Sequence, residues 1–167
     1  MSLPSWTHRA PPLRDTRSAV VGRWHPGTLA ELSAARHQLG AALHDGSRPA
    51  GTAAGAVQRL LLVFEELASN ALRHGRLPVE VTVTRTGRSW LLEVSDAAGE
   101  DAPTPAADRD PALGGLGLPL VATISAAHGW TAVGARKVVW ASMDFTRPEA
   151  SDAPRDPRPR GGRRPVR

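Results

Sequence analysis

The chain has 167 residues and no cysteine, and its formal net charge at neutral pH is +5. This length fits one domain, because each of two smaller domains would bury too little apolar surface to be stable. The lack of cysteine excludes disulfides and thiolate metal sites. Residues 151–167 carry six arginines against two aspartates, so the rest of the chain is close to neutral. Nucleic-acid-binding domains gather basic residues on a folded face, so this distribution argues against direct nucleic-acid binding.

Both ends of the chain are rich in Pro, Arg and Gly and poor in large apolar residues. Such segments bury too little surface to offset the entropy lost on ordering, so residues 1–17 and 148–167 are predicted to be disordered around one folded domain at residues 18–147. No apolar run approaches the ~20 residues needed to span a bilayer, and residues 1–14 lack the apolar stretch of a signal peptide. The sequence therefore predicts a cytoplasmic protein without a membrane partner.

The first predicted elements are a strand and a helix. Residues 18–24 form a β-like run that Pro26 interrupts. Thr28 and Glu31 stand three residues apart before a stretch with helical apolar spacing, which is a capping-box pattern. We therefore expect a helix that begins after Thr28 and runs through Leu43.

A second helix and a hairpin follow a loop at residues 44–55. Residues 57–73 have the apolar spacing of a helix, and Gly75 is the residue type favoured just past a helix C-terminus. Residues 79–84 alternate apolar and polar side chains, and residues 90–95 form a second strand-like run. A short glycine-containing connection predicts that these two strands pair as a hairpin.

The last third of the chain contains a long proline-rich loop at residues 97–114, a length that is typical of lids and binding loops. A helix is predicted at residues 118–128, stopped by Gly129, and a second hairpin at residues 130–133 and 138–145. Paired strands with helices grouped apart predict an α+β fold, a two-layer sandwich of a mixed or mostly antiparallel sheet with helices on one face.

The second helix carries the first candidate site. Glu66 and Asn70 lie one turn apart on its polar side. A carboxylate and an amide oxygen at this spacing can hold Mg²⁺ or a water, and Glu66 can act as a general base. The alternative is a solvated polar face, which every amphipathic helix has. His74 borders the apolar face near the helix end, where a histidine is more often a packing or capping residue.

Two further segments have the residue types of a nucleotide site. Asp96 stands where a strand runs into a loop, and its carboxylate can accept a hydrogen bond from the exocyclic amine of a base, although Asp is also an ordinary turn former. Gly114, Gly115 and Gly117 precede a helix whose free amides suit phosphate oxygens, although such clusters also cap helices and form hinges. No Gly-Lys-Ser/Thr follows, and no βαβ unit leads into the glycines, which excludes P-loop and Rossmann sites.

Together and in this order, the three segments resemble the N, G1 and G2 boxes of the GHKL fold, shared by gyrase, chaperone, histidine kinase and mismatch-repair ATPases. Residues 66–75, 115–118 and 137–141 look like those of actinobacterial anti-sigma-factor serine-protein kinases. The similarity covers residues 18–145. It implies a Bergerat-type ATP-binding fold with ATP and Mg²⁺ as ligands.

The resemblance also implies a role for individual residues. Glu66 would activate the attacking hydroxyl, Asn70 would hold Mg²⁺, and Asp96 would bind the adenine amine. Residues 97–114 would form the ATP lid. The remaining ATP-binding residues that it implies are Arg73, His74, Gly99, Gly115, Leu116, Gly117 and Leu118.

One position departs from the family pattern. The G1 box has Gly two residues after the Asp, whereas this chain has Ala98 there and Gly99 one residue later. An added methyl group would crowd the approach of a base to the backbone.

The function implied by the resemblance is an anti-sigma factor that is also a Mg²⁺/ATP-dependent serine-protein kinase. Such a protein binds a sigma factor and phosphorylates an anti-anti-sigma partner with a STAS domain, and it can form a homodimer. The alternative is a non-catalytic module in which nucleotide gates the binding of a protein partner.

Overall fold

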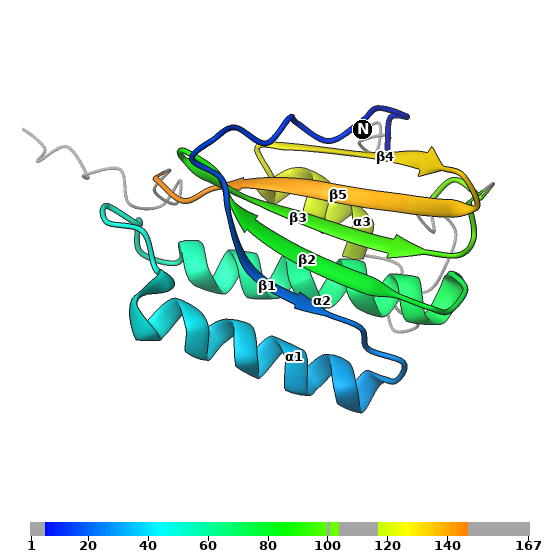
Figure 1. Cartoon of the computed structure of the whole chain (residues 1–167), viewed down its shortest axis with the longest axis horizontal. Coiled ribbons are helices and arrows are strands. Elements are labelled where there is room, and N and C mark those ends of the chain that lie inside the picture. Colours follow the sequence, from blue (N-terminus) through cyan, green and yellow to red (C-terminus); the bar gives the residue numbers. More distant parts are fainter. Residues whose placement is uncertain (1–5, 100, 104–116, 147–167) are drawn as a thin grey trace, which may run out of the picture.

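The computed structural model describes residues 6–99, 101–103 and 117–146. Its strands form one five-stranded sheet in the order β1-β2-β3-β5-β4, and every neighbouring pair is antiparallel. The helices cover one face of this sheet (Figure 1). The predicted α+β sandwich is therefore confirmed. The elements are β1 Ala19–Trp24, α1 Leu29–Ala42, the short π-helix η1 Leu43–Ser47, α2 Ala56–His74, β2 Glu80–Arg85, β3 Ser89–Asp96, α3 Gly117–Ile124, β4 Ala127–Val133 and β5 Arg136–Asp144.

The N-terminus of α1 forms as the sequence predicts. Thr28 is the N-cap, and its Oγ1 accepts a hydrogen bond from the Glu31 backbone N–H at 3.2 Å. The Glu31 carboxylate reaches back and accepts from the backbone N–H of Gly27 at 2.6 Å, one residue before the cap. Two amides near the helix start are thus satisfied by side chains, which fixes the direction in which α1 leaves β1.

The central helix is α2, which packs against the sheet and lies between α1 and α3 (Figure 1). Its apolar stripe is buried because each of these layers contributes apolar side chains to one common core. The buried members of the stripe are Val57, Leu60, Val63, Phe64, Leu67, Ala68 and Ala71. The polar side of α2, with Glu66 and Asn70, is left at the margin of that core.

Both predicted hairpins form, and their register fixes two cross-strand pairs that matter below. The strands alternate side chains between the helix face and the opposite face of the sheet. Asp96 at the end of β3 stands opposite Lys137 near the start of β5, and Glu93 stands opposite Trp140. Asp96 is two residues after Val94, and Lys137 is two residues before Val139. Both valines belong to the core under the helices, so the side chains of Asp96 and Lys137 also lie on the helix face of the sheet.

The third helix is shorter than predicted. It ends at Ile124, and residues 127–129 belong to β4 instead of continuing the helix to residue 128. Gly129 is therefore a strand residue opposite Trp140, not a helix stop. A Cβ at this position would lie 3.0 Å from the Trp140 indole and 3.1 Å from the carbonyl oxygen of Thr7, so glycine is needed for close packing.

Part of the N-terminal segment for which the sequence predicts disorder, residues 6–17, lies against the sheet. Its Thr7 carbonyl accepts from Trp130 N–H at 3.1 Å, and its Arg9 N–H donates to the Trp130 carbonyl at 2.8 Å, which extends the sheet beyond β4. Trp6 is buried and contacts the His128 ring at 4.9 Å. One large aromatic side chain and an open strand edge give this segment contacts that its average composition does not indicate. The predicted tail at residues 148–167 lies outside the described residues.

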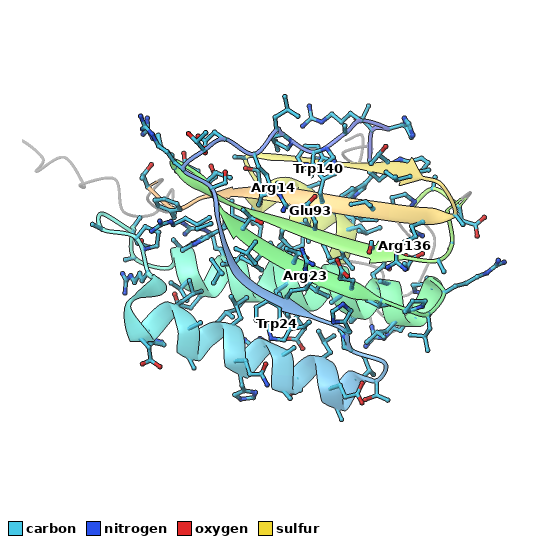
Figure 2. All side chains as sticks on the ribbon, in the orientation of Figure 1. Arg14, Arg23, Trp24, Glu93, Arg136 and Trp140 are labelled. Atoms are coloured by element: carbon cyan, nitrogen blue, oxygen red, sulfur yellow. The ribbon has the colours of Figure 1, made fainter. Side chains whose placement is uncertain are left out.

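The same segment covers part of the sheet face that has no helices. Trp140 donates from Nε1 to the Arg9 carbonyl at 2.9 Å, and the Arg9 guanidinium lies 5.0 Å from the centre of the Trp140 ring. Arg14 forms an ion pair with Glu93, and Figure 2 shows these side chains together on the open face. Trp140 is consequently buried although it is not part of the core cluster under the helices.

Replacing Trp6 with alanine tests whether these contacts stabilise the fold. We expect a loss of less than the ~3–5 kcal/mol typical of an embedded tryptophan, because a terminal segment can detach and relieve the cavity. Chemical denaturation of the purified chain measures the change, with Leu13→Ala as control because Leu13 is 97% exposed. Equal stability of both variants would contradict an ordered N-terminal segment.

None of the helices in the described ranges is long and apolar enough to cross a membrane.

Candidate functional site

The acid and the amide predicted on α2 are both half-buried and one helical turn apart. The helix between them is held by its buried face, and Ser69 donates its hydroxyl to the Glu66 carbonyl at 3.3 Å. Arg73, one turn further on, is exposed on the same helix. The polar edge of α2 therefore presents an acid, an amide and a cation in succession.

The first residue of α3 lies against the Glu66 carboxylate. A Cβ built on Gly117 would clash with Glu66 Oε2. The glycine segment before α3 and the candidate base on α2 are thus brought together, as the resemblance implies. Gly115 and Leu116 lie outside the described residues, and so does most of the predicted lid. Leu118 has a buried side chain in the core, so only its backbone can face a ligand.

The environment of Glu66 favours the protonated acid. Burial raises the pKa of its carboxyl, and the neighbouring Glu65 carboxylate raises this pKa further, while Arg73 opposes both effects. A carboxylate with a raised pKa is a better proton acceptor than an ordinary surface glutamate. Perturbed acids of this kind are concentrated at functional sites.

The second part of the site, the corner around Asp96, lies where the end of α2 meets the end of β3. The Asp96 side chain is 1% exposed, and its Oδ1 accepts from the backbone N–H of Ala98 at 2.7 Å. Its other oxygen, Oδ2, lies close to the Gly75 backbone, where an added Cβ would meet it at 2.6 Å. The Ala97 N–H donates to the Arg76 carbonyl at 2.8 Å, which ties the two elements together.

Gly75 therefore has a different role from the one that the sequence predicts. It is the C-cap of α2, but its φ is −88° and its backbone is extended, so it is not a left-handed cap that requires glycine. Glycine is required because Asp96 occupies the space that a side chain would need. The residue couples the helix end to the buried carboxylate.

Ala98, the position that departs from the family pattern, fits its surroundings. It is 3% exposed, and none of the non-glycine residues in the described ranges has a positive φ, so the alanine is unstrained. Its N–H holds the Asp96 carboxylate. Gly99 is buried against the turn between β4 and β5, where an added Cβ would meet the Ala135 carbonyl carbon at 2.7 Å. Its side-chain space is thus filled by protein backbone.

Two basic residues of β5 complete this part of the site, and the sequence predicts a role for neither. Lys137 is buried, with Nζ 3.4 Å from Asp96 Oδ2. Arg136 donates to Ser95 Oγ at 2.7 Å and to the carbonyls of Ser95 and Pro78 at 3.3 and 3.2 Å. These bonds connect the start of β5, the end of β3 and the entry to β2. The corner is therefore a braced site that positions Asp96.

A cleft of about 200 Å³ opens between α1 and α2 and reaches Glu66. An ion pair crosses it, with Arg36 Nε 3.1 Å from Glu65 Oε2. The cleft therefore combines charged side chains with an apolar patch at the start of α1. Its lining residues are Leu29, Leu32, Ser33, Arg36, Glu65, Glu66, Ser69 and Arg73.

Of the predicted site residues in the described ranges, only Glu66 and Arg73 line this cleft. Asn70 and Asp96 are not among its lining residues, and neither is His74, which is exposed at the last residue of α2. Within the described ranges, no group of three or more His, Asp or Glu side chains could hold a metal by itself. A metal here would need ligands from outside the protein, such as phosphate oxygens, in addition to Asn70.

Gly75→Ala tests how tightly the corner is packed. We expect the free energy of unfolding to fall by about 1–3 kcal/mol, because the new methyl group would lie 2.6 Å from both the Ala71 carbonyl oxygen and the Asp96 carboxylate. Urea denaturation measures the change. Gly87→Ala is the control, because nothing lies within 4 Å of a Cβ at that turn. If the two variants are equally stable, the close approach of Asp96 to the helix end is wrong.

The fold combines a helix that carries Glu and Asn, a neighbouring helix that begins at a glycine, and an antiparallel sheet with an acid at the end of one strand. This is the layout of an ATP-binding domain. The chain belongs to the histidine kinase-like ATPase domain family, whose sequence profile matches residues 25–143. No curated protein matches the chain. Family membership implies ATP as the ligand, ordinarily with Mg²⁺, and a kinase or ATPase reaction.

Among solved structures, the chain is similar to the histidine kinase AdeS of Acinetobacter baumannii. The two are 15% identical over 55% of this chain and 48% of that chain, with a TM-score of 0.42. The chain thus spans about half the length of that kinase.

Proposed function

We propose that the chain is a serine-protein kinase of the anti-sigma-factor type. In this proposal it binds ATP with Mg²⁺ and transfers the terminal phosphoryl group to a serine of an anti-anti-sigma partner with a STAS domain. It also binds a sigma factor, and a homodimer is compatible with this role. The family supports ATP and a kinase or ATPase reaction, whereas the serine acceptor and both partners are parts of the proposal.

The observation that carries the proposal is the contact between Gly117 and Glu66. The start of α3 offers free amides to phosphate oxygens. The Glu66 carboxylate, which is the candidate general base, lies directly beside it. A serine hydroxyl that reaches Glu66 is then also next to the terminal phosphate. Phosphoryl transfer requires mainly such positioning together with neutralisation of charge.

The proposed reaction is a direct transfer. Glu66 accepts the proton of the serine hydroxyl as the serine oxygen attacks the γ-phosphorus, and the bond from that phosphorus to the bridging oxygen breaks. The bridging oxygen keeps the electron pair and leaves as part of ADP. In this proposal Asn70, one turn away, holds Mg²⁺ through its amide oxygen. When bound, the ion neutralises phosphate charge.

The cleft between α1 and α2 supports a protein acceptor rather than water alone. It reaches Glu66 from the outside of the molecule and combines an apolar patch with charged side chains. Leu29, 52% exposed, is one of its lining residues, and the Arg36–Glu65 ion pair lies across it. A loop of a partner that carries the serine can enter here and contact both kinds of surface.

Binding of a fluorescent ATP analogue, with and without Mg²⁺, tests the nucleotide site first. We expect saturable, Mg²⁺-dependent binding that is lost in Asn70→Ala and Asp96→Ala. Transfer is then measured with γ-labelled ATP and the STAS-domain proteins of the same organism. A labelled serine on one of them supports the kinase. Nucleotide binding that alters partner association without any labelled product would instead support the non-catalytic module.

Gly117→Ala separates the contact with Glu66 from the fold. The clashing atom is the end of a flexible side chain, so we expect stability to change little, but the carboxylate must move away from the phosphate site. Transfer should fall by up to roughly 10²-fold, as for other misplaced catalytic groups. Gly40→Ala in α1 is the control, since its Cβ would make only an ordinary 3.8 Å contact. Unchanged transfer in Gly117→Ala would contradict the proposed arrangement.

A further inference from the structure

Lys137 stands out among the basic residues of this chain. Lysine and arginine together number 21, and Lys137 is the single lysine. It is also deeply buried, at 6% exposure, on the helix face of the sheet. An ammonium group is compact and has three rotatable donors, whereas a guanidinium is a wide, planar fork. The buried position is thus occupied by the smaller cation.

The ion pair between Lys137 and Asp96 is incomplete. The Nζ–Oδ2 distance of 3.4 Å exceeds the ~2.7–2.9 Å of a charge-assisted hydrogen bond. Within the described residues, Oδ2 is buried and accepts no hydrogen bond. Taking both charges out of water is unfavourable, and a loose pair recovers little of that loss. The geometry leaves the Oδ2 acceptor and the Nζ donor side by side without a close hydrogen bond between them.

A third group that binds to both must match this pair. It needs an N–H donor that faces Oδ2 of Asp96 and, next to that donor, an acceptor that faces Nζ of Lys137. The edge of a 6-aminopurine has this order, with the exocyclic amine beside the unprotonated ring nitrogen N1. A 6-oxopurine has the reverse order, with a carbonyl where Oδ2 needs a donor and an N–H where Nζ needs an acceptor.

We propose that Lys137 is a specificity-determining residue that donates directly to N1 of the base, while Asp96 accepts from the 6-amino group. This inference rests on the proposed nucleotide site and adds a base-reading residue to it. Asp96 is held in place by the Ala98 N–H, and Arg136 braces the adjoining strand ends. The pair is therefore preorganised, so the base loses little affinity to rearrangement of the site.

The test compares ATP with 1-deaza-ATP, in which N1 is replaced by C–H and the amine is kept. Calorimetry with the wild-type chain should show roughly ten- to hundred-fold weaker binding of 1-deaza-ATP, since one charged hydrogen bond is lost. In Lys137→Met the two nucleotides should bind equally, with affinity for ATP reduced to that of the analogue. Equal binding of both by the wild type, or discrimination that persists in Lys137→Met, overturns the inference. No saturable binding of ATP by the wild type overturns the proposed nucleotide site as well.

A second measurement needs no variant, because the chain has one lysine to observe. In protein labelled with ¹⁵N-lysine, the ammonium group gives one signal. Saturating ATP should slow the exchange of its protons with water, and saturating 1-deaza-ATP should not. Equal slowing by both nucleotides means that the base merely shields Lys137 and that N1 is not its acceptor, which also overturns the inference.

Discussion

Glu66→Gln is expected to lower the rate of phosphoryl transfer by roughly 10²–10⁴-fold, the usual contribution of a general base, and to leave ATP bound. The amide is nearly isosteric but cannot accept the serine proton. The Glu66 carboxylate lies against the start of α3. It makes no described contact with Asp96, the residue that we expect to bind the adenine. Affinity for the nucleotide should therefore persist. Transfer from γ-labelled ATP and binding of a fluorescent analogue are the two readouts.

The stability of the same variant should move in the opposite direction from its activity. The pKa of Glu66 is raised in the folded chain, chiefly by burial, so folding favours the protonated form. The associated stabilisation is present below the pKa of the unfolded chain and is lost as pH rises through the higher folded pKa. At neutral pH the charged carboxylate therefore destabilises the folded chain, and Glu66→Gln should melt at the same or a slightly higher temperature.

Glu80→Gln is the matched control, because Glu80 lies between the core residues Val79 and Val81 and its side chain is therefore on the sheet face opposite α2, where it pairs with His25 at 3.0 Å. It should transfer phosphate at the wild-type rate. In the wild type, transfer should rise with pH as Glu66 loses its proton, and this rise should be absent in Glu66→Gln. If Glu66→Gln retained wild-type transfer, Glu66 could not be the base.

Features that depend on local sequence could be predicted. The helical period of α2 places Glu66 and Asn70 on one polar edge, and the capping pattern at Thr28 fixes the start of α1. Alternation at residues 79–84 and three further strand-like runs predict two hairpins, and with helices grouped apart this is enough for the α+β class. These signals span only a few residues each, so no tertiary information is needed to read them.

Features that depend on contacts between distant segments could not be predicted. Gly75 looks like an ordinary helix cap, but it is required by a carboxylate 21 positions later in the chain, and Gly129 is required by an indole on the next strand. The Asp96–Lys137 pair depends on the register of two strands that are not consecutive. Trp6 is buried because its segment lies along the edge of β4, and the residues next to Trp6 in the sequence do not indicate this contact.

Asp96→Ala is expected to have the largest combined effect on binding and stability. It removes the acceptor for the base amine and for the Ala98 N–H, and it leaves the Lys137 ammonium buried without its partner. Breaking one side of a buried ion pair typically reduces stability by about 3–5 kcal/mol. We expect a loss of that order in urea denaturation and no measurable binding of an ATP analogue.

The double variant Asp96→Ala with Lys137→Met separates these two effects. Removing both charges leaves no uncompensated ion, so the double variant should be more stable than Asp96→Ala alone, a strongly non-additive result. It still lacks the acceptor for the base amine, so ATP binding should not return. Recovery of stability without recovery of binding would show that Asp96 and Lys137 stabilise each other's burial but that the base requires Asp96 itself. If the double variant were no more stable than Asp96→Ala, the cation would have other partners and the pair would not be the unit that this corner is built around.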